Sequence, residues 1–575
     1  MSIHDSRRAV VTKRLTAFGG IRSIARISDS CASEMTNFRI LPDGSLEKRC
    51  GYGTVIQSTG AIRGYWEGNL AGTHYIFYVA GTSLYRRSQS DTAPVLLTTL
   101  NASDARVSFL LFCGVLYLFD GFTVLAFKPA LGIFSAAMGY VPLYGKDWHP
   151  DSLGDVNEPL NLLCNSIRVH YLNSTATQVF QLPFTAARIQ SVTVGGAPIT
   201  NYTFKAPSST VTIPASAATG GDVVIAFDLD AAFGNRSAVV KACHGAVYRD
   251  GCRETLLTFG GESGYRVFRT AEVTEEMLAA AEKAYTGTDA LYFRAEDTLS
   301  LGSAEHPVTA AVQYLDRMLV FHDSGVWVLR CPGTGQDRME ITVYQSGIGC
   351  VAPDGAVLCR GVPVVLSPSG VGRIGLISSG SDICKMTLIS GNVADRLTEA
   401  VLRNAVIRWS DRENRIWLRD ITDAEGTVWL SDPEGEHWTR YTGIPANLLV
   451  DCQGAPGFTT AAGKIAAFDD ALLTDDGQSF EASYTGAFLD FSRPEDVRRT
   501  GYMALSADSR GAQIKLTAEN DRTGHTFTFT GKVQTSPEFF GGRFAIGRFR
   551  FLRYRITVPG TARARILGLS VSVSI

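Results

Sequence analysis

The sequence predicts an all-β chain: a β-propeller of about six or seven blades, with an inserted small β-sandwich and a C-terminal β-sandwich. Three observations predict this fold class. A hairpin pattern recurs along the chain, a segment of short strands interrupts it, and the spacing of the strands changes near the C-terminus. The 57 glycines suit many tight turns, and a hydrophobic content of 45% suits large cores.

The recurring pattern is an apolar run, a Gly, a second apolar run, a Gly-bearing tight turn and a third apolar run. Its clearest copies are VSFLLFCGVLYLFDGFTVLAFK at 107–128 and AVQYLDRMLVFHDSGVWVLR at 311–330, and further copies occur at 73–87, 246–268, 356–377, 407–430 and 457–469. A period of roughly 45 to 60 residues predicts propeller blades, because one blade cannot bury its apolar face alone. The alternative is a sandwich or barrel of unrelated hairpins, since the copies share no strict consensus.

Tight turns that combine Asp or Pro with Gly separate the predicted strands. The turn residues that we expect to be structural are Pro42, Asp43, Gly44, Asp120, Gly121, Asp323, Gly325, Asp432 and Gly435. Two turns, at 422–429 and 431–438, resemble the Asp-box of sialidase-type propellers, in which Asp caps a turn and Trp packs between strands. They indicate folding devices and imply no sugar chemistry. The acidic turn with Asp420, Asp423 and Glu425 is an alternative calcium site, although it lacks the residue order of a dedicated calcium loop.

The domain boundaries follow from the strand spacing. Short strands between 165 and 230, with a Gly195-Gly196 turn, predict a sandwich inserted between blades, and TEEMLAAAEKAY at 274–285 predicts a helix capped by Thr274. The predicted parts are 1–160 for an N-terminal strand segment and the first blades, 161–233 for the inserted sandwich, 234–475 for the remaining blades, and 476–575 for the C-terminal sandwich.

Charge is balanced over the chain but not within its last part. The 54 basic and 56 acidic residues give a net charge of −2, which predicts no strong attraction of the whole molecule to nucleic acid or membrane. Within RFRFLRYR, the basic residues Arg548, Arg550, Arg553 and Arg555 flank aromatic residues, as in an alternating strand with the aromatic side chains inward. This strand is predicted to face DNA or an acidic partner. A solvated strand face is the alternative.

Catalytic motifs are absent from the sequence. It has no GxSxG, Walker loop or HExxH, and its nine His and eleven Cys are scattered. We therefore expect no catalytic residue, no cofactor, no metal site and no enzyme activity. The most apolar stretch, 109–127, is interrupted by Gly114, Asp120 and Gly121, so we expect strands there and no membrane-spanning segment.

The N-terminal residues are similar to the opening of bacteriophage tail and connector propeller proteins. The similarity comprises a glycine pair at 19–20, the Asn-containing segment 28–40, the PDGS turn with the KR pair at 42–49, and Gly51-Tyr52. Segments 189–196, 202–204 and 211–213 of the insertion look similar to small sandwich insertions in the same proteins. The resemblance covers about 50 residues at the start and about 65 in the insertion. It lies in the spacing of strands and turns rather than in a rigid motif. The C-terminal sandwich departs from the compact members of this group.

This resemblance implies a virion structural protein of the tail nozzle or packaged-DNA stabilisation type. Such a protein would form a homo-oligomeric ring, six-fold in symmetry, at the head-to-tail connector or nozzle, where it retains packaged DNA and lines the DNA exit channel. Its expected partners are other connector, portal or tail proteins, with non-specific contact to packaged DNA. Its expected location is the virion, after synthesis in the host cytoplasm.

A second hypothesis is a propeller that binds or cleaves glycans and acts as a phage receptor-recognition protein. Exposed aromatic side chains would favour it, because sugars stack on them. The candidate platform residues are Trp327, Trp409, Trp417, Trp429 and Trp438, although their places in strands and turns favour core packing.

Overall fold

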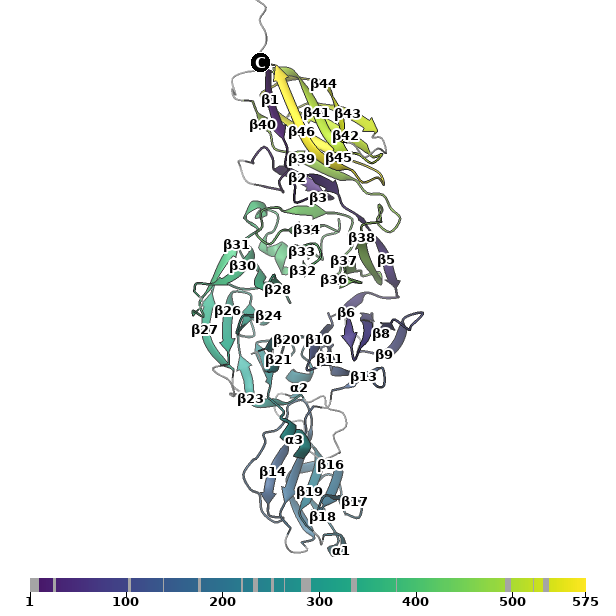
Figure 1. Ribbon diagram of the computed structural model, residues 1–575. Helices are drawn as coiled ribbons and strands as arrows, with labels where there is room; N and C mark the ends of the chain where they lie inside the picture. The colour runs from purple at the N-terminus through teal and green to yellow at the C-terminus, as the bar shows by residue number, and fades with distance from the viewer. Residues whose placement is uncertain are drawn as a thin grey trace, which may run out of the picture. The chain divides into compact units, whose positions relative to one another are not determined.

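The computed structural model describes residues 10–574 except 24–26, 102–104, 138, 174–176, 219–220, 231–235, 250–252, 263, 281–290, 332–338, 379, 492–497, 521 and 531–536. The chain divides into two compact units, Met1–Arg63 with Gly347–Ile575, and Gly64–Ser346. The predicted fold class is confirmed, because the described chain is nearly all-β and consists of many small sheets (Figure 1).

The second unit contains four sheets of the blade type, each with four antiparallel strands in chain order. They are β6 (Ile62–Leu70), β7 (Thr73–Ala80), β8 (Ser83–Ser88) and β9 (Val95–Thr99); β10 (Ser108–Phe112), β11 (Val115–Phe119), β12 (Val124–Lys128) and β13 (Ile133–Ala136); β20 (His244–Arg249), β21 (Glu254–Phe259), β22 (Arg266–Thr270) and β23 (Phe293–Ser300); and β24 (Val308–Tyr314), β25 (Arg317–His322), β26 (Gly325–Arg330) and β27 (Glu340–Ser346).

The second strand of a blade carries the longest apolar run, since it packs against a neighbouring blade on each face. Every residue of β25 is buried, and so are the last five of β7, which matches the continuous apolar pattern of a strand covered on both sides. The first strands of successive blades contact one another, β10 with β20 and β20 with β24. This side-by-side order of first strands is the arrangement of propeller blades.

The inserted domain follows β13 and forms a sheet of six strands around its own core. Its elements are β14 (Leu143–Trp148), β15 (Ser166–Tyr171), β16 (Val179–Val194), β17 (Ala197–Ile199), β18 (Ser208–Thr212), β19 (Val223–Leu229) and the short helix α1 (Ala215–Ala218). The long strand β16 pairs with β17, β18 and β19, and bulges bend it between these partners. The predicted Gly195-Gly196 turn joins β16 to β17, with both glycines at positive φ.

Two further helices lie in the second unit, α2 (Arg236–Val240) and α3 (Glu275–Ala280). The backbone N–H of Met277 donates to Oγ1 of Thr274 over 3.1 Å, as the predicted N-cap requires. The predicted helical residues 281–285 lie outside the described residues. Among the residues that the structure describes, every helix is too short or too polar to cross a membrane.

The first unit contains three more sheets of the blade type. They consist of β28 (Ala356–Cys359), β29 (Val362–Ser367), β30 (Gly370–Leu376) and β31 (Cys384–Leu388); β32 (Ala405–Ser410), β33 (Arg415–Asp420), β34 (Val428–Ser431) and β35 (Thr439–Tyr441); and β36 (Leu448–Cys452), β37 (Ala455–Thr459), β38 (Lys464–Asp469) and β5 (Gly51–Gln57). The 3₁₀ helix η1 (Gly391–Val393) and α4 (Glu399–Arg403) connect the first two sheets. The fourth strand of the last blade, β5, therefore comes from the N-terminal part of the chain.

The sandwich of the first unit combines both ends of the chain (Figure 1). One sheet holds β1 (Val10–Leu15), β3 (Phe38–Ile40), β4 (Leu46–Lys48), β41 (Arg498–Asp508), β44 (Glu538–Phe549) and β46 (Arg565–Ser574). The other holds β2 (Ala32–Thr36), β39 (Ala482–Gly486), β40 (Leu489–Asp490), β42 (Gln513–Glu519), β43 (Gly524–Thr530) and β45 (Phe551–Val558). The sequence grouped the N-terminal strands with the first blades, whereas β1 and β4 pair with β46. No local pattern reveals so distant a partner.

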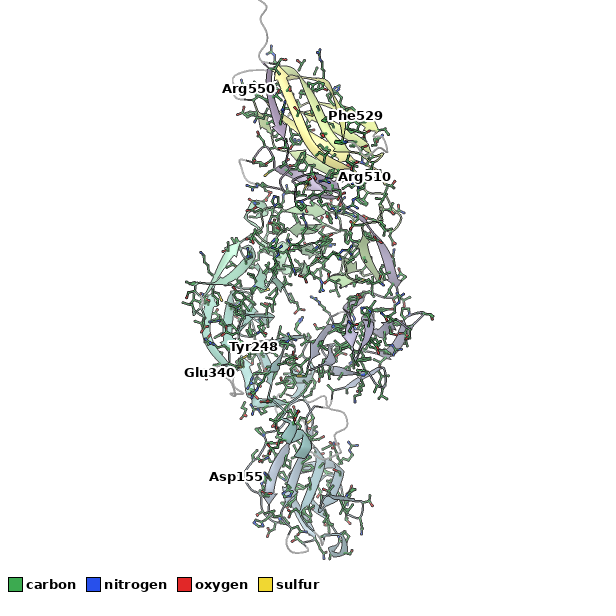
Figure 2. All side chains as sticks on the ribbon, viewed as in Figure 1. Asp155, Tyr248, Glu340, Arg510, Phe529 and Arg550 are labelled. Atoms are coloured by element: carbon green, nitrogen blue, oxygen red, sulfur yellow. The ribbon has the colours of Figure 1, made fainter. Side chains whose placement is uncertain are left out.

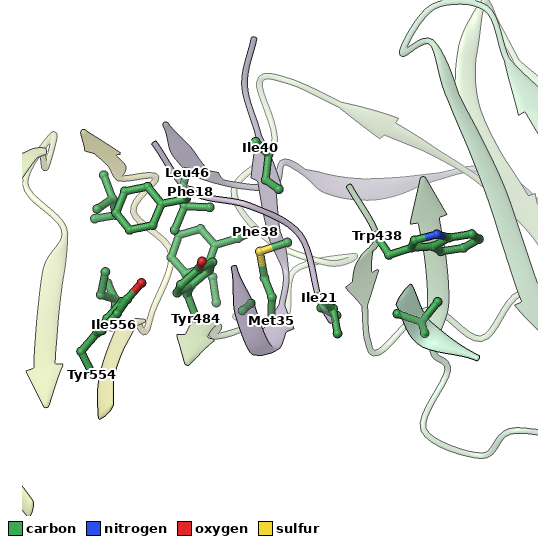
Figure 3. Close-up of a cluster of buried hydrophobic side chains, with 14 of the residues drawn as sticks. Phe18, Ile21, Met35, Phe38, Ile40, Leu46, Trp438, Tyr484, Tyr554 and Ile556 are labelled. Carbon is green, nitrogen blue, oxygen red and sulfur yellow. The ribbon is translucent and has the colours of Figure 1, made fainter. Parts of the chain in front are cut away.

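A parallel pair between Thr36 of β2 and Arg440 of β35 joins this second sheet to the blade β32–β35. A common core lies under the joint (Figure 3). Met35, Phe38 and Tyr484 are buried there beside the sandwich strands, and Trp438 is buried beside the blade. Within this unit, the sandwich therefore shares its core with the blade β32–β35.

Candidate functional site

The four basic residues predicted as one strand lie on two different sheets. Arg548 lies on β44, Arg553 and Arg555 lie on β45, and the chain crosses from one sheet of the sandwich to the other at Arg550 (Figure 2). The predicted inward alternation is therefore wrong at this crossing: Phe549 and Tyr554 are buried, but Phe551 is 45% exposed. The physical reason is that a change of sheet resets the face on which side chains point.

The two pairs of arginines differ in their electrostatic surroundings. Glu519 of β42 accepts a hydrogen bond from Nε of Arg553 over 2.8 Å and lies 3.6 Å from Arg555. Arg548 and Arg550 are exposed, with no ion pair to another described residue. Since Glu519 neutralises part of the charge on β45, Arg548 and Arg550 are the better placed to contact a phosphate or carboxylate.

The predicted turn residues lie in tight turns or directly beside them in the structure. Gly44, Gly121 and Gly435 have positive φ, and Pro42 precedes the first of these turns. Asp120 accepts hydrogen bonds from the backbone N–H groups of Phe122 and Thr123 over 2.8 and 2.6 Å. Asp43 accepts from Ser45 and pairs with Arg565, which ties the turn to β46. Asp323 lies in the β25–β26 turn, and Gly325 is the first residue of β26 directly after it.

The turn that resembles an Asp-box packs inside the first unit. Asp432 accepts a hydrogen bond from the backbone N–H of His437 over 2.6 Å, and Nε1 of Trp438 donates to the carbonyl of Ile389 over 2.8 Å. The neighbouring acidic turn uses its carboxylates in the same way. Asp420 accepts from Thr422, and Asp423 accepts from Glu425 and Thr427, so these oxygens already have protein donors.

A buried polar network that sequence reasoning missed joins the sandwich to the last blade. Arg49 donates to Asp475 through two nitrogens, with Nη1 2.7 Å from Oδ1 and Nη2 2.5 Å from Oδ2, and its Nε donates to Oδ1 of Asn37 over 2.9 Å. The guanidinium also lies 3.9 Å from the ring centre of Phe480. We call Asn37, Lys48, Arg49, Asp475 and Phe480 the Arg49 clasp. The available sequence signal was a pair of basic residues between apolar Leu46 and Cys50.

Lys48 completes the clasp. Its Nζ donates to the backbone carbonyls of Phe480 and Gly560 over 2.6 and 2.5 Å. Burial, together with repulsion from Arg49, lowers the pKa of Lys48 to about 8. Three of the residues that carry the N-terminal resemblance, Asn37, Lys48 and Arg49, therefore belong to an internal joint.

A cavity of about 510 Å³ lies beside this joint, still within the first unit. Its charged lining residues are Arg39, Arg412, Glu413, Arg415, Asp432 and Asp470. Burial raises the pKa of Glu413, whereas hydrogen bonds from His437 outweigh burial and lower the pKa of Asp432. Two carboxylates with pKa values shifted in opposite directions are a pattern that acid–base chemistry uses.

The outer strands of several blades expose large apolar side chains. They are Val95 and Leu96 on β9, Ile133 on β13, and Ile341 and Tyr344 on β27 in the second unit, and Leu388 on β31 in the first. We call them the outer-strand apolar residues. Exposed apolar side chains on strand edges favour association, because the edge also offers unpaired backbone groups.

The tryptophans of the glycan hypothesis are mostly internal. Trp417, Trp429 and Trp438 are buried, and Trp438 is fully so. Trp327 and Trp409 are partly buried: Trp327 packs against Tyr344, and Nε1 of Trp409 donates to Asp411. These five residues therefore do not form one exposed platform.

No protein-family model and no curated protein matches the chain. Solved structures do match it. The extracellular domain of a one-component system from B. thetaiotaomicron matches with 9% identity and a TM-score of 0.37, over 92% of this chain and 64% of that one. An exo-β-1,3-galactanase from Phanerochaete chrysosporium matches with 7% identity and a TM-score of 0.24, over 91% of this chain and 100% of that one.

These matches correct one expectation. The sequence led us to expect a protein that is not an enzyme, but the matched structures include glycoside hydrolases, which align with 91% and 89% of the chain. At 7% and 8% identity the likeness concerns the fold. It assigns no reaction to any residue of this chain.

Proposed function

We propose that the chain is a subunit of a homo-oligomeric ring in a bacteriophage virion, at the head-to-tail connector or tail nozzle, where the ring encloses the DNA exit channel and helps to retain packaged DNA. The observation that supports ring formation is the exposure of the outer-strand apolar residues. Leu96, for example, is 54% exposed, and Ile341 is 43% exposed. The placement at a phage tail rests on the resemblance of the N-terminal residues.

A second copy of the chain is the occupant that fits these edges. Outer strands β9 and β27 present both unpaired backbone groups and apolar side chains, so a neighbouring blade edge can cover them. A stable interface buries about 800 Å² on each partner, so more than one outer strand would have to take part. In a ring each subunit would use two different faces, because a closed head-to-tail contact is heterologous.

The charge distribution supports a channel that passes DNA without holding it tightly. A net charge of −2 gives the subunit no general attraction to phosphate. Exposed Arg548 and Arg550 add a local attraction, and each phosphate contact strengthens salt-dependent binding. A few such residues per subunit, repeated around a ring, would retain DNA weakly.

The ring is tested by sedimentation velocity of the purified chain over a wide concentration range. We expect closed oligomers at a fixed multiple of 62.1 kDa, with six copies visible in electron-microscopic class averages. Leu96→Asp combined with Ile341→Asp should dissociate them. Leu153→Asp, which alters an exposed leucine in a loop of the inserted domain, should not. A monomer at every concentration contradicts the proposal.

The location is tested by cryo-electron microscopy of virions that contain the chain. A ring on the tail axis around DNA is the expected result. Copies at peripheral fibre or spike positions contradict the connector and nozzle placements and favour host recognition.

We infer a glycan-directed role as the second candidate, because Glu413 and Asp432 line one cavity with pKa values shifted apart. A receptor-recognition protein would bind a host polysaccharide there, and a glycan-cleaving one would use the two carboxyl groups. A screen against cell-wall polysaccharides tests this role. We expect saturable binding of one polysaccharide. Glu413→Gln should weaken that binding or, if the polysaccharide is cleaved, abolish the cleavage. No binding to any polysaccharide would refute it.

A further inference from the structure

Two histidines and an aspartate meet at one end of the blade β24–β27. His322 ends β25, and Asp323 follows it in the turn to β26. Val308 of β24 pairs with His322, so the chain just before Val308 passes beside this turn and brings His306 to it. Nδ1 of His306 lies 2.8 Å from Oδ1 of Asp323, and Nδ1 of His322 lies 3.5 Å from the same oxygen.

We propose that His306, His322 and Asp323 bind a divalent transition-metal cation, with Zn²⁺ the best match to this donor set. One ligand atom from each residue lies within 4.8 Å of the other two. In a tetrahedral zinc site with bonds of about 2.0–2.2 Å, ligand atoms are about 3.3–3.6 Å apart, so small side-chain shifts suffice. Two imidazoles and a carboxylate are ligands that Zn²⁺ and similar metals favour.

Polar groups surround Nδ1 of His322 on the side of the proposed cation. The backbone N–H of Ser324 donates to Nδ1 of His322 over 3.4 Å, so this nitrogen presents its lone pair. The same nitrogen lies 3.5 Å from Oδ1 of Asp323, so a positive charge between the two atoms stabilises both.

The surrounding residues fix the histidines and leave a route of entry. The ring of His322 stacks on Tyr344 with 5.7 Å between ring centres, and a Cβ at Gly325 would lie 2.6 Å from the Tyr344 hydroxyl oxygen and 2.8 Å from Nε2 of His322. Only glycine therefore leaves room for both rings. His306 is held in a short turn by reciprocal backbone hydrogen bonds with Ser303, and 48% of its side chain is exposed. A cation would approach the buried His322 from the side of the exposed His306.

Three protein ligands leave a fourth tetrahedral position for water or for a donor from another molecule. Bound metal would join the loop before β24 to the β25–β26 turn. We therefore expect it to raise the melting temperature of the full chain.

The test is a Co²⁺ and Zn²⁺ titration of the chelator-treated full chain, followed by calorimetry and by the visible spectrum of Co²⁺. We expect one equivalent of metal bound through nitrogen and oxygen, and a melting temperature that Zn²⁺ raises. His306→Ala and Asp323→Asn should each weaken binding at least tenfold and abolish the Zn²⁺-dependent rise in melting temperature. Both residues are on loops and partly exposed, so these variants should fold, which circular dichroism checks.

The matched control is His437→Ala. His437 also pairs with an aspartate, Asp432 at 3.7 Å, but belongs to no three-ligand group among the described residues. Metal binding in this variant should equal that of the original chain. Equal binding in all four proteins, a thiolate charge-transfer band of Co²⁺, or no uptake of either metal would overturn the proposal.

Discussion

Arg49 and Arg550 both belong to the first unit. Each lies beside aromatic residues, Arg49 in space and Arg550 in the sequence, but Arg49 is buried and Arg550 is exposed. The side chain of Arg49 is 1% exposed and donates to a carboxylate, an amide and two backbone carbonyls. Arg550 is exposed where the chain passes between the two sheets of the sandwich. A basic residue in an apolar strand context can therefore be either a buried joint or a surface contact.

The energetic consequences differ as strongly as the surroundings. A buried charge that loses its partner remains desolvated and unpaired, which costs several kcal/mol. An exposed arginine is already hydrated, and its attraction to a partner is screened by salt. Substitutions in the Arg49 clasp should therefore change folding, whereas those at Arg548 and Arg550 should change binding.

The largest effect is expected for Arg49→Ala. It leaves Asp475 buried without its ion pair, so the free energy of unfolding of the full chain should fall by about 3–5 kcal/mol. Urea denaturation followed by tryptophan fluorescence measures it. Arg555→Ala, at an exposed ion pair, is the control and should cost less than about 1 kcal/mol. Similar losses in the two variants would remove the contrast between the regions.

A smaller loss is expected for Gly51→Ala at the start of β5. An added Cβ would lie 1.9 Å from the backbone oxygen of Thr474, directly before Asp475, so the clasp must shift. Overpacking of this kind costs about 1–3 kcal/mol. At Gly53 a Cβ meets only the side-chain end of Leu472 at 3.1 Å, and Gly53→Ala should cost less. Thermal unfolding of the two variants gives the comparison.

Substitution of the exposed arginines should alter binding to DNA with little effect on folding. Arg548→Ala with Arg550→Ala should change the free energy of unfolding by less than about 1 kcal/mol. It should reduce the salt dependence of DNA binding, with a slope lower by about 0.9 for each phosphate that the variant no longer neutralises. Arg553→Ala with Arg555→Ala should have the smaller effect, because Glu519 already neutralises them in part. Unchanged DNA binding and ring formation in both double variants would refute a partner-facing role.

The smallest expected effect is a pH dependence of the folding stability that the Arg49 clasp contributes. The pKa of Lys48 is about 8 in the folded chain and has an ordinary value of 10.5, so the unfolded chain holds more protons between these values. Stability contributed by this group therefore rises with pH from about 8 to 10.5. Lys48→Met should remove this rise, and Lys385→Met, at an exposed lysine of β31, should leave it. Equal pH profiles for the original chain and Lys48→Met would contradict the lowered pKa.

Local patterns were sufficient to predict the blades. In 107–128 and 311–330 each apolar run became a strand and each Asp- and Gly-bearing turn became a hairpin turn, because these preferences act over neighbouring residues. The RFRFLRYR segment shows the limit of such reasoning. Its alternation predicts one strand with the aromatic side chains inward. The chain instead crosses between sheets at Arg550, so Phe551 is exposed.

The candidate sites were harder to predict for the same reason. Arg49 contacts Asp475 through packing between segments that are distant in the sequence, and His306 lies beside His322 because of the register of the β24–β25 hairpin. Isolated residues in a single sequence carry no sign of such partners, so the clasp and the metal-ligand group were not foreseen. The positive φ at Gly44 and Gly121 was foreseeable, because a tight turn demands it locally.

Short-range periodicity and turn chemistry, both readable from the sequence, were enough to establish the all-β class, the blade hairpins, the inserted domain and the structural turns. Tertiary packing alone established that β5 completes the last blade, that the first strands pair with β46, and which charged residues are buried. Those outcomes depend on contacts between residues hundreds of positions apart. Their free energy comes from burial and pairing that exist only once the chain has folded.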